Sequence, residues 1–128
     1  MNSNLINNLL NFLKNRSLEL VGLALIASSI LLSISFISYS PNDPSFVYGE
    51  SNNVIKNFLG IYGSTISDFL LQSFGLVSFL FLVTLISWGF TLIHNKNLNN
   101  LITKIFFVVL YLLFGSTFLY IFNNNSFW

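Results

Sequence analysis

The chain has 128 residues, of which 54% are hydrophobic and 7% are charged, and its mean hydropathy is +0.74. An average soluble domain carries roughly 25% charged residues, so this composition excludes a water-facing globule and indicates a membrane protein. The formal net charge of +1 gives no support for nucleic-acid binding, and the lack of cysteine excludes disulfides and thiolate metal sites. We expect an all-α fold: a polytopic helical membrane protein with three transmembrane helices and an interfacial amphipathic helix.

Residues 1–17 form a largely polar amino-terminal segment in which apolar side chains recur at helical spacing. This spacing predicts one apolar face on a helix. A short amphipathic helix at the membrane surface and a partner-binding helix both fit the pattern, and a partly ordered polar tail fits it equally well. The apolar residues are Leu5, Ile6, Leu9, Leu10 and Leu13.

A transmembrane domain is expected over residues 18–122, and its first span covers about 18–40. Glu19, at the start of this span, is its one charged residue. A signal peptide is the competing interpretation, but its apolar region would be about 7–15 residues long and would end in an A-x-A-like site. This run is longer and ends in Ser, Tyr and Pro, which favours a retained helix. The small residues of this span suggest close contact with neighbouring helices, and Ser29 and Ser33 form a small-xxx-small pair. These small residues are Gly22, Ala24, Ala27, Ser28, Ser29, Ser33 and Ser35.

Residues 41–72 are expected to be an external loop followed by an interfacial helix. The polar loop covers 41–53, and from Val54 onward apolar and polar residues separate onto opposite sides of a helix. Gly60 and Gly63 weaken that helix, so they either permit close packing or mark a break.

The second and third spans are expected at about 73–93 and 105–122, followed by a tail at 123–128. The second span contains no charged residue and reaches about 31 Å at the helical rise, which is enough to cross a bilayer core. The third span is shorter, at about 27 Å.

Basic residues near the ends of the spans predict the orientation of the chain. The segment 41–72 has one lysine against three acidic residues, whereas the other ends are basic. We therefore expect the amino terminus and the loop at 94–104 in the cytoplasm, and residues 41–72 outside. The basic residues that support this are Lys14, Arg16, Lys96 and Lys104.

The sequence offers little chemistry, and we expect no catalytic, cofactor-binding or metal-binding residue. His94 is the one histidine, and a metal site or general base would need a partner that its surroundings do not supply. No ionisable residue falls at the middle of a span, whereas transporters usually bury one there. No Gly-x-x-x-x-Gly-Lys-Ser/Thr phosphate loop occurs. The pattern indicates a membrane scaffold.

Two stretches, SYSPNDPSF at 38–46 and NFLGIYGSTISD at 57–68, carry ordered motifs of Pro, Gly and Asp. They resemble the segment after the first transmembrane helix and the segment before the second span in the FtsK family of bacterial DNA translocases. That family also has a Phe-Gly pair at the start of its next helix and a Trp-Gly pair near the end of that helix. The residues that carry the resemblance are Ser38, Tyr39, Pro41, Asp43, Pro44, Ser45, Phe46, Asn57, Gly60, Gly63, Ser64, Ser67, Asp68, Phe74, Gly75, Trp88 and Gly89.

The resemblance implies the amino-terminal four-helix membrane domain of the FtsK/SpoIIIE family. Such a domain lies in the bacterial plasma (inner) membrane as a multi-pass protein and anchors a motor at the division septum. Its partners would be the lipid bilayer and other division-site membrane proteins, and a homo-oligomer is compatible with it. In the family, a linker then leads to a cytoplasmic ATPase that pumps DNA during cell division and chromosome segregation.

This chain departs from the family pattern in what it lacks. It has three clear spans instead of four, and neither linker nor motor, so we expect a fragment or an interrupted reading frame. The chain itself is then not an enzyme and makes no direct contact with nucleotide or nucleic acid. Two alternatives stay open: a stand-alone small membrane protein, either a hole-forming oligomer or a transport-complex subunit, and a membrane-embedded enzyme using His94 or Asp68.

Overall fold

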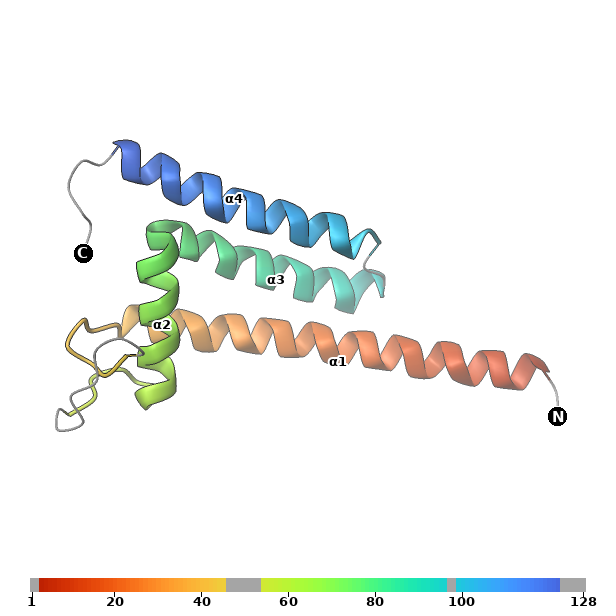
Figure 1. Cartoon of the computed structure of the whole chain (residues 1–128). Coiled ribbons are helices and arrows are strands. Elements are labelled where there is room, and N and C mark those ends of the chain that lie inside the picture. Colours follow the sequence, from red (N-terminus) through yellow and green to blue (C-terminus); the bar gives the residue numbers. More distant parts are fainter. Residues whose placement is uncertain (1–2, 46–53, 97–98, 123–128) are drawn as a thin grey trace.

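The structure is a computed structural model that describes residues 3–45, 54–96 and 99–122. Its elements are the helices α1 (Ser3–Ile37), α2 (Gly60–Phe74), α3 (Ser78–Asn95) and α4 (Leu101–Phe122), with a short 3₁₀ turn η1 (Gly75–Val77) before α3. All regular structure in the described ranges is helical, which confirms the expected all-α fold. Helices α1, α3 and α4 run roughly along one direction, and α2 crosses them at one end (Figure 1).

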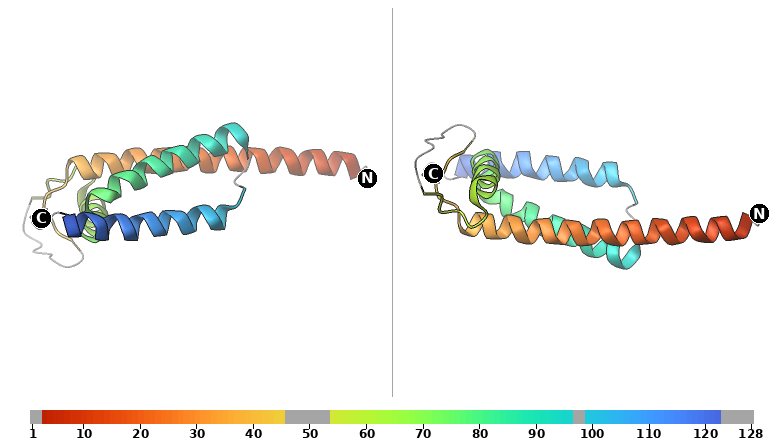
Figure 2. Two further views of the ribbon diagram at one scale, coloured as in Figure 1. Left: turned by 90° about the horizontal axis from the view of Figure 1, so that it is seen from above. Right: turned by 90° about the horizontal axis from the view of Figure 1, so that it is seen from below.

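The bundle formed by α1, α3 and α4 has two ends. At the loop end, α1 finishes at Ile37 and α4 finishes at Phe122, while at the turn end α3 finishes at Asn95 and α4 begins at Leu101 (Figures 1 and 2). Within the part of the chain that the structure describes, three helical stretches are long and apolar enough to cross a membrane, namely Leu5–Ile37, Gly60–Asn95 and Leu101–Phe122. The expected number of membrane-spanning helices is therefore confirmed.

Helix α1 is one unbroken helix of 35 residues and includes both the amino-terminal segment and the first span. The carboxylate of Glu19 lies 2.9 Å from the Lys96 ammonium, which places residue 19 level with the end of α3. Residues 3–18 therefore extend about 24 Å beyond the turn end (Figure 1). The helix ends three residues before the expected Ser40, because a proline ring clashes with the carbonyl four residues earlier, and Pro41 stands four residues after Ile37.

The second helix begins later than the apolar pattern from Val54 indicated. Residues 54–59 are not helical, and α2 starts at Gly60, whose φ of +66° is accessible to glycine without strain. Gly63, by contrast, permits a close approach, since a Cβ there would lie 2.3 Å from the Asn57 Oδ1 atom. The two glycines therefore have different roles: Gly60 starts the helix and Gly63 makes room beside it.

The expected second span is interrupted by a corner at its beginning. Gly75 adopts φ 57° and ψ −139°, a conformation open to glycine alone, and the chain turns from α2 through η1 into α3. The Ser78 hydroxyl donates to the Leu70 carbonyl at 2.7 Å and closes the corner. The apolar contact of Phe36, Leu71 and Leu82 joins α1, α2 and α3 just beside it.

Helices α1 and α3 approach each other closely where two glycines face. A Cβ added at Gly89 would lie 2.8 Å from the Gly22 carbonyl oxygen, and one added at Gly22 would lie 2.8 Å from the Gly89 carbonyl oxygen. Further along the same interface, the fully buried Ser29 hydroxyl donates to the Leu82 carbonyl at 3.0 Å. Small residues thus bring the two backbones together, as in many membrane helix pairs.

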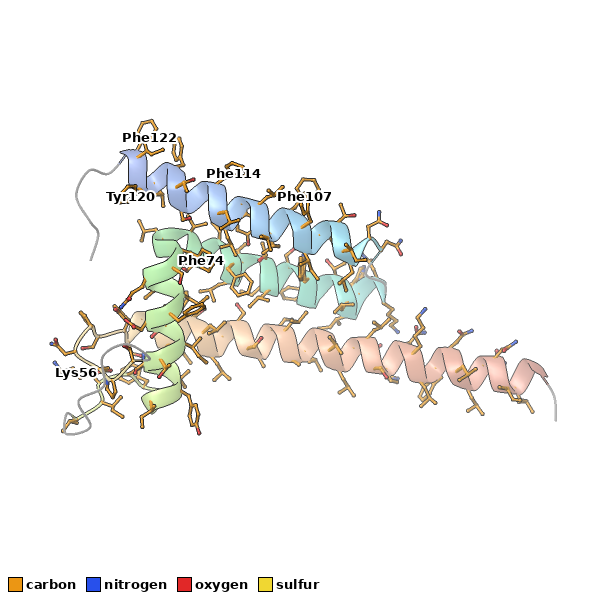
Figure 3. The ribbon with its side chains drawn as sticks, in the orientation of Figure 1. Lys56, Phe74, Phe107, Phe114, Tyr120 and Phe122 are labelled. Atoms are coloured by element: carbon orange, nitrogen blue, oxygen red, sulfur yellow. The ribbon has the colours of Figure 1, made fainter. Side chains whose placement is uncertain are left out.

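Helix α4 packs loosely and has no buried residue. Its contacts with the rest of the bundle include Gly115 against Val77, and a hydrogen bond of 3.1 Å between the hydroxyls of Tyr111 and Thr84. Phe107, Phe114 and Phe122 point away from α3 (Figure 3). Such an apolar surface suits contact with lipid or with another helix.

The glycine contact predicts that Gly89→Ala destabilises the bundle although alanine favours helices. The added methyl group meets backbone atoms that cannot move independently, so overpacking should lower the free energy of unfolding by about 1–3 kcal/mol. Unfolding in mixed detergent micelles, followed by circular dichroism, measures the change. Ala24→Val on the exposed side of α1 is the control and should cost less than about 1 kcal/mol. Equal stability of Gly89→Ala and the unsubstituted chain would contradict this packing.

Candidate interaction site at the loop end

Helix α2 turns its polar face toward the protein and its apolar face outward. Gly63, Ser64, Ser67, Asp68 and Leu71 are its buried residues. The outward face is strongly exposed and carries Ile61, Tyr62 and Phe69. In a membrane, such outward apolar side chains enter the lipid boundary, so the polar face must find its partners inside the protein.

The first of these partners is the loop residue Asp43, which is only 5% exposed. Its Oδ2 atom accepts the backbone N–H groups of Lys56 at 3.1 Å and Asn57 at 2.8 Å, and its Oδ1 atom lies 3.0 Å from the Lys56 nitrogen. The carboxylate therefore holds the chain that returns to α2. The neighbouring Pro44 carbonyl accepts the Ser64 hydroxyl, which fixes the loop to α2 directly.

Asn57 is the centre of the second group of contacts and is 4% exposed. Its side-chain amide donates to the Ser35 carbonyl at 3.0 Å, and its Oδ1 atom accepts the Leu59 N–H at 3.0 Å. The Ser35 and Ser67 hydroxyls both donate to the Gly63 carbonyl at 2.7 Å. One asparagine thus ties the end of α1 to the first turn of α2.

Tyr39 and Asp68 form the third group. The Tyr39 hydroxyl donates to the Asp68 Oδ1 atom at 2.8 Å, and the Gln72 amide donates to the same atom at 2.7 Å. Burial and the adjacent Asp68 carboxylate raise the pKa of Tyr39 to about 12. The phenol therefore keeps its proton, and stays a donor to Asp68, at any physiological pH.

Taken together, these contacts define the loop-end cluster. It unites motif residues from two stretches that are separated in the sequence, and its members are Ser35, Tyr39, Asp43, Pro44, Asn57, Gly63, Ser64, Ser67, Asp68 and Gln72. Within the described residues, no buried side-chain nitrogen or oxygen lacks a hydrogen-bond partner.

The other motif residues lie around this cluster or along α3. Pro41 is exposed in the turn after α1, and Ser45 lies half-buried beside Pro44. Phe46 lies outside the described residues. The other two pairs are apart from the cluster: Phe74 and Gly75 form the corner before α3, while Trp88 and Gly89 lie on α3, where Gly89 contacts α1.

The cluster has the chemistry of a scaffold. The part of the chain that the structure describes contains no group of three or more His, Cys, Asp or Glu residues that could hold a metal ion. His94 lies exposed near the end of α3, at the turn end, and is remote from Asp68 along the bundle. Most hydrogen bonds of the cluster end on a backbone group, while those of Tyr39 and Gln72 end on the Asp68 carboxylate, so the cluster holds the loop, the end of α1 and α2 together.

The sequence indicated Gly22 and Ser35 as small residues that permit close helix contact, but it identified neither their partners nor the pairing of Glu19 with Lys96. The pairing could have been found, because the predicted orientation placed both residues at the same side of the membrane. Ser35 and Gly22 carry no such signal, since each is one of several small residues in α1 and the partner decides which of them matters.

The contacts of Asp43 predict that Asp43→Ala frees the loop from α2. The N–H groups of Lys56 and of the buried Asn57 then lose their acceptor, which costs about 1–3 kcal/mol locally. Amide hydrogen exchange at Lys56 and Asn57 should accelerate about tenfold or more. The neighbouring exposed residue Asn42 supplies the control, and Asn42→Ala should leave both exchange rates unchanged. Unchanged protection in Asp43→Ala would show that the carboxylate does not hold this segment.

The sequence of this chain is similar to those of known proteins. A family model described as the 4TM region of DNA translocase FtsK/SpoIIIE matches residues 14–128. The DNA translocase FtsK of Rickettsia typhi (strain ATCC VR-144 / Wilmington) is 35% identical over 102 residues, which cover 80% of this chain and 13% of that protein. The DNA translocase FtsK of Rickettsia prowazekii (strain Madrid E) is 35% identical over 107 residues, covering 84% and 14% respectively. No solved structure matches significantly.

The chain thus spans about one seventh of the length of these relatives, and the matched family is a membrane region rather than a motor. The match therefore concerns the membrane region of these proteins. The resemblance to this family is confirmed, and the match over residues 14–128 is longer than the stretch from Ser38 to Gly89 that carries the motifs. The chain belongs to the family of the 4TM membrane region of the DNA translocases FtsK/SpoIIIE.

Proposed function

We propose that this chain is the membrane-anchoring, septum-associated domain of an FtsK-like DNA translocase that acts in cell division and chromosome segregation. The observation that carries the proposal is the loop-end cluster. Motif residues from the two ends of the loop, among them Tyr39, Asp43 and Asp68, form hydrogen bonds that hold the surface of the loop end in one shape. A domain that served only as an anchor would need spans but would not need a shaped outer surface.

The distribution of charge supports an anchor over a transporter. All the charged side chains of the described residues lie at the two ends of the bundle or beyond them, and none is at mid-depth. An ion or proton pathway would require such a group within the membrane. The family match likewise favours the anchor over a stand-alone hole-forming protein or transport subunit.

The proposal includes an orientation in the bacterial inner membrane. The turn end carries Lys96 and Lys104, and α1 brings Lys14 and Arg16 close to it, so this end faces the cytoplasm. Residues 1–17 are then the cytoplasmic segment, residues 18–122 form the transmembrane domain, and the loop-end cluster faces outward. Other division-site membrane proteins would meet that outer surface, and a homo-oligomer would use the exposed faces of the spans.

The orientation can be tested with single cysteines, because the chain has none of its own. Asn42→Cys and Asn99→Cys place matched thiols at exposed positions of the loop end and the turn end. A membrane-impermeant maleimide added to intact spheroplasts should label Asn42→Cys at once. Asn99→Cys should react only after the membrane is permeabilised. The reverse pattern of labelling would overturn the orientation.

Association with the septum can be tested by fluorescence microscopy. The chain carries a fluorescent protein at its amino terminus and is expressed at low level in a dividing rod-shaped bacterium. We expect a fluorescent band at mid-cell, and Asp43→Ala should weaken the band several-fold at unchanged membrane content because it loosens the outer surface. Uniform fluorescence around the envelope by the unsubstituted chain would refute the septal part of the proposal and leave membrane anchoring intact.

A further inference from the structure

The side of α1 that faces away from α3 carries a stripe of exposed apolar side chains. Beyond the turn end, the stripe consists of Ile6, Leu10 and Leu13, which are 38%, 58% and 59% exposed. Within the span it continues through Leu20 and Leu31, which are 68% and 50% exposed. The glycine and serine contacts with α3 lie on the other side of the helix. The stripe therefore runs for about 38 Å along α1.

The stripe has the spacing of a coiled-coil seam. From Ile6 to Leu31 its positions are separated by alternating steps of four and three residues, and three exposed small residues, Ser17, Ala24 and Ala27, occupy the remaining positions. This spacing, kept over more than three heptads, holds one side of a helix against a partner helix. The small residues let two helix backbones approach each other closely. The stripe is therefore shaped to meet another helix.

The two parts of the stripe lie in different surroundings. Glu19 is level with the end of α3 through its contact with Lys96, so the positions from Leu20 onward lie in the span. Ile6, Leu10 and Leu13 lie beyond the bundle, on the part of α1 that extends past the other helices (Figure 1). Lipid chains can cover the first part but not the second. A helix that runs beside α1 covers both.

The part of α1 beyond the turn end has one apolar and one polar side. The stripe lies on the apolar side, and Asn8 and Asn11 lie on the opposite side. Residues 14–21 contain neither glycine nor proline, and α1 passes through them without a break. The Arg16 guanidinium bonds the Glu19 carboxylate one turn further along the same helix. The extension therefore continues the span instead of lying down on the membrane, and its apolar side faces water unless another protein covers it.

We propose that α1 pairs with α1 of a second copy of this chain along the stripe, parallel and in register. Copies of one membrane protein insert with the same orientation, so their first helices run parallel and each stripe residue meets its own counterpart. The stripe contains no charged residue, so identical residues meet without repulsion. The Ser17 hydroxyl donates to the Leu13 carbonyl at 2.9 Å and needs no partner from the other copy. The pairing requires a second copy and no division protein, so it does not depend on septal association.

Disulfide formation between copies tests the pairing, because the chain has no cysteine of its own. Leu10→Cys, Leu13→Cys and Ala27→Cys place a thiol on the stripe, whereas Asn8→Cys and Asn11→Cys place one on the opposite side of α1. Membranes that contain one variant at a time receive a mild oxidant, and non-reducing gel electrophoresis measures the fraction of linked pairs. A disulfide needs two Cα atoms within about 7 Å of each other, so we expect the stripe variants to exceed the controls by about fivefold or more.

A double substitution then tests the apolar side chains of the stripe. Leu10→Asn combined with Leu13→Asn lies beyond the bundle, so each copy should keep its fold, as circular dichroism will verify. The yield of linked pairs from Ala27→Cys should fall by about tenfold or more, because two apolar layers of the pairing are lost. Asn8→Ala combined with Asn11→Ala is the matched control on the polar side and should leave that yield unchanged.

Three results would overturn the proposal. Equal yields from the two sides of α1 would show random collision between separate copies. Linkage of Leu13→Cys to a different protein would assign the stripe to another partner. A Leu13→Cys chain that stays single, yet is protected from a water-soluble maleimide, would show that lipid covers the stripe. Each result concerns contact between copies alone and leaves the mid-cell test of septal association unaffected.

Discussion

A polar group that is buried away from water must find its partner within the protein, and most features of this chain follow from that constraint. Serine hydroxyls in the spans donate to carbonyls of their own helix, as Ser33 does, or across helices, as Ser29 does. Charged side chains stay at the two ends. At the loop end, where backbone leaves the helices, Asp43 and Asn57 supply the missing partners.

The same constraint explains why α2 turns its polar face inward. Its length and apolar face alone would allow it to lie on a membrane as an isolated amphipathic helix, with its polar face in water. Here Ser64, Ser67 and Asp68 meet the end of α1 and the returning loop instead, while Ile61 and Tyr62 face outward. With its polar face inward, α2 crosses one end of the bundle and is bonded to the loop that follows α1. The loop-end cluster therefore closes this end of the fold.

Much of the fold was predictable because its causes are local. The three spans follow from uninterrupted apolar runs, and the end of α1 follows from Pro41. The beginnings of the first span and of α2 could not be predicted from the apolar pattern, because they depend on backbone contacts. Nothing between Lys14 and Leu18 breaks a helix, so α1 continues through the expected boundary at residue 17. The pattern from Val54 looked helical, yet residues 54–59 are not helical. Side chains accept the N–H groups of this segment instead: Asp43 accepts those of Lys56 and Asn57, and Ser38 accepts that of Phe58.

The sequence by itself determined that this protein lies in a membrane, how many times it can cross, and that its charges lie at the ends of the bundle. Its ordered motifs also indicated the family, which the comparison confirmed. Only the tertiary structure decided which serine and which glycine matter, which way α2 faces, and that Glu19 joins Arg16 to Lys96. The physical reason is that hydropathy reports the preference of each residue for lipid or water. It does not report which of two distant residues will meet, and these contacts join segments that lie 20 to 80 residues apart.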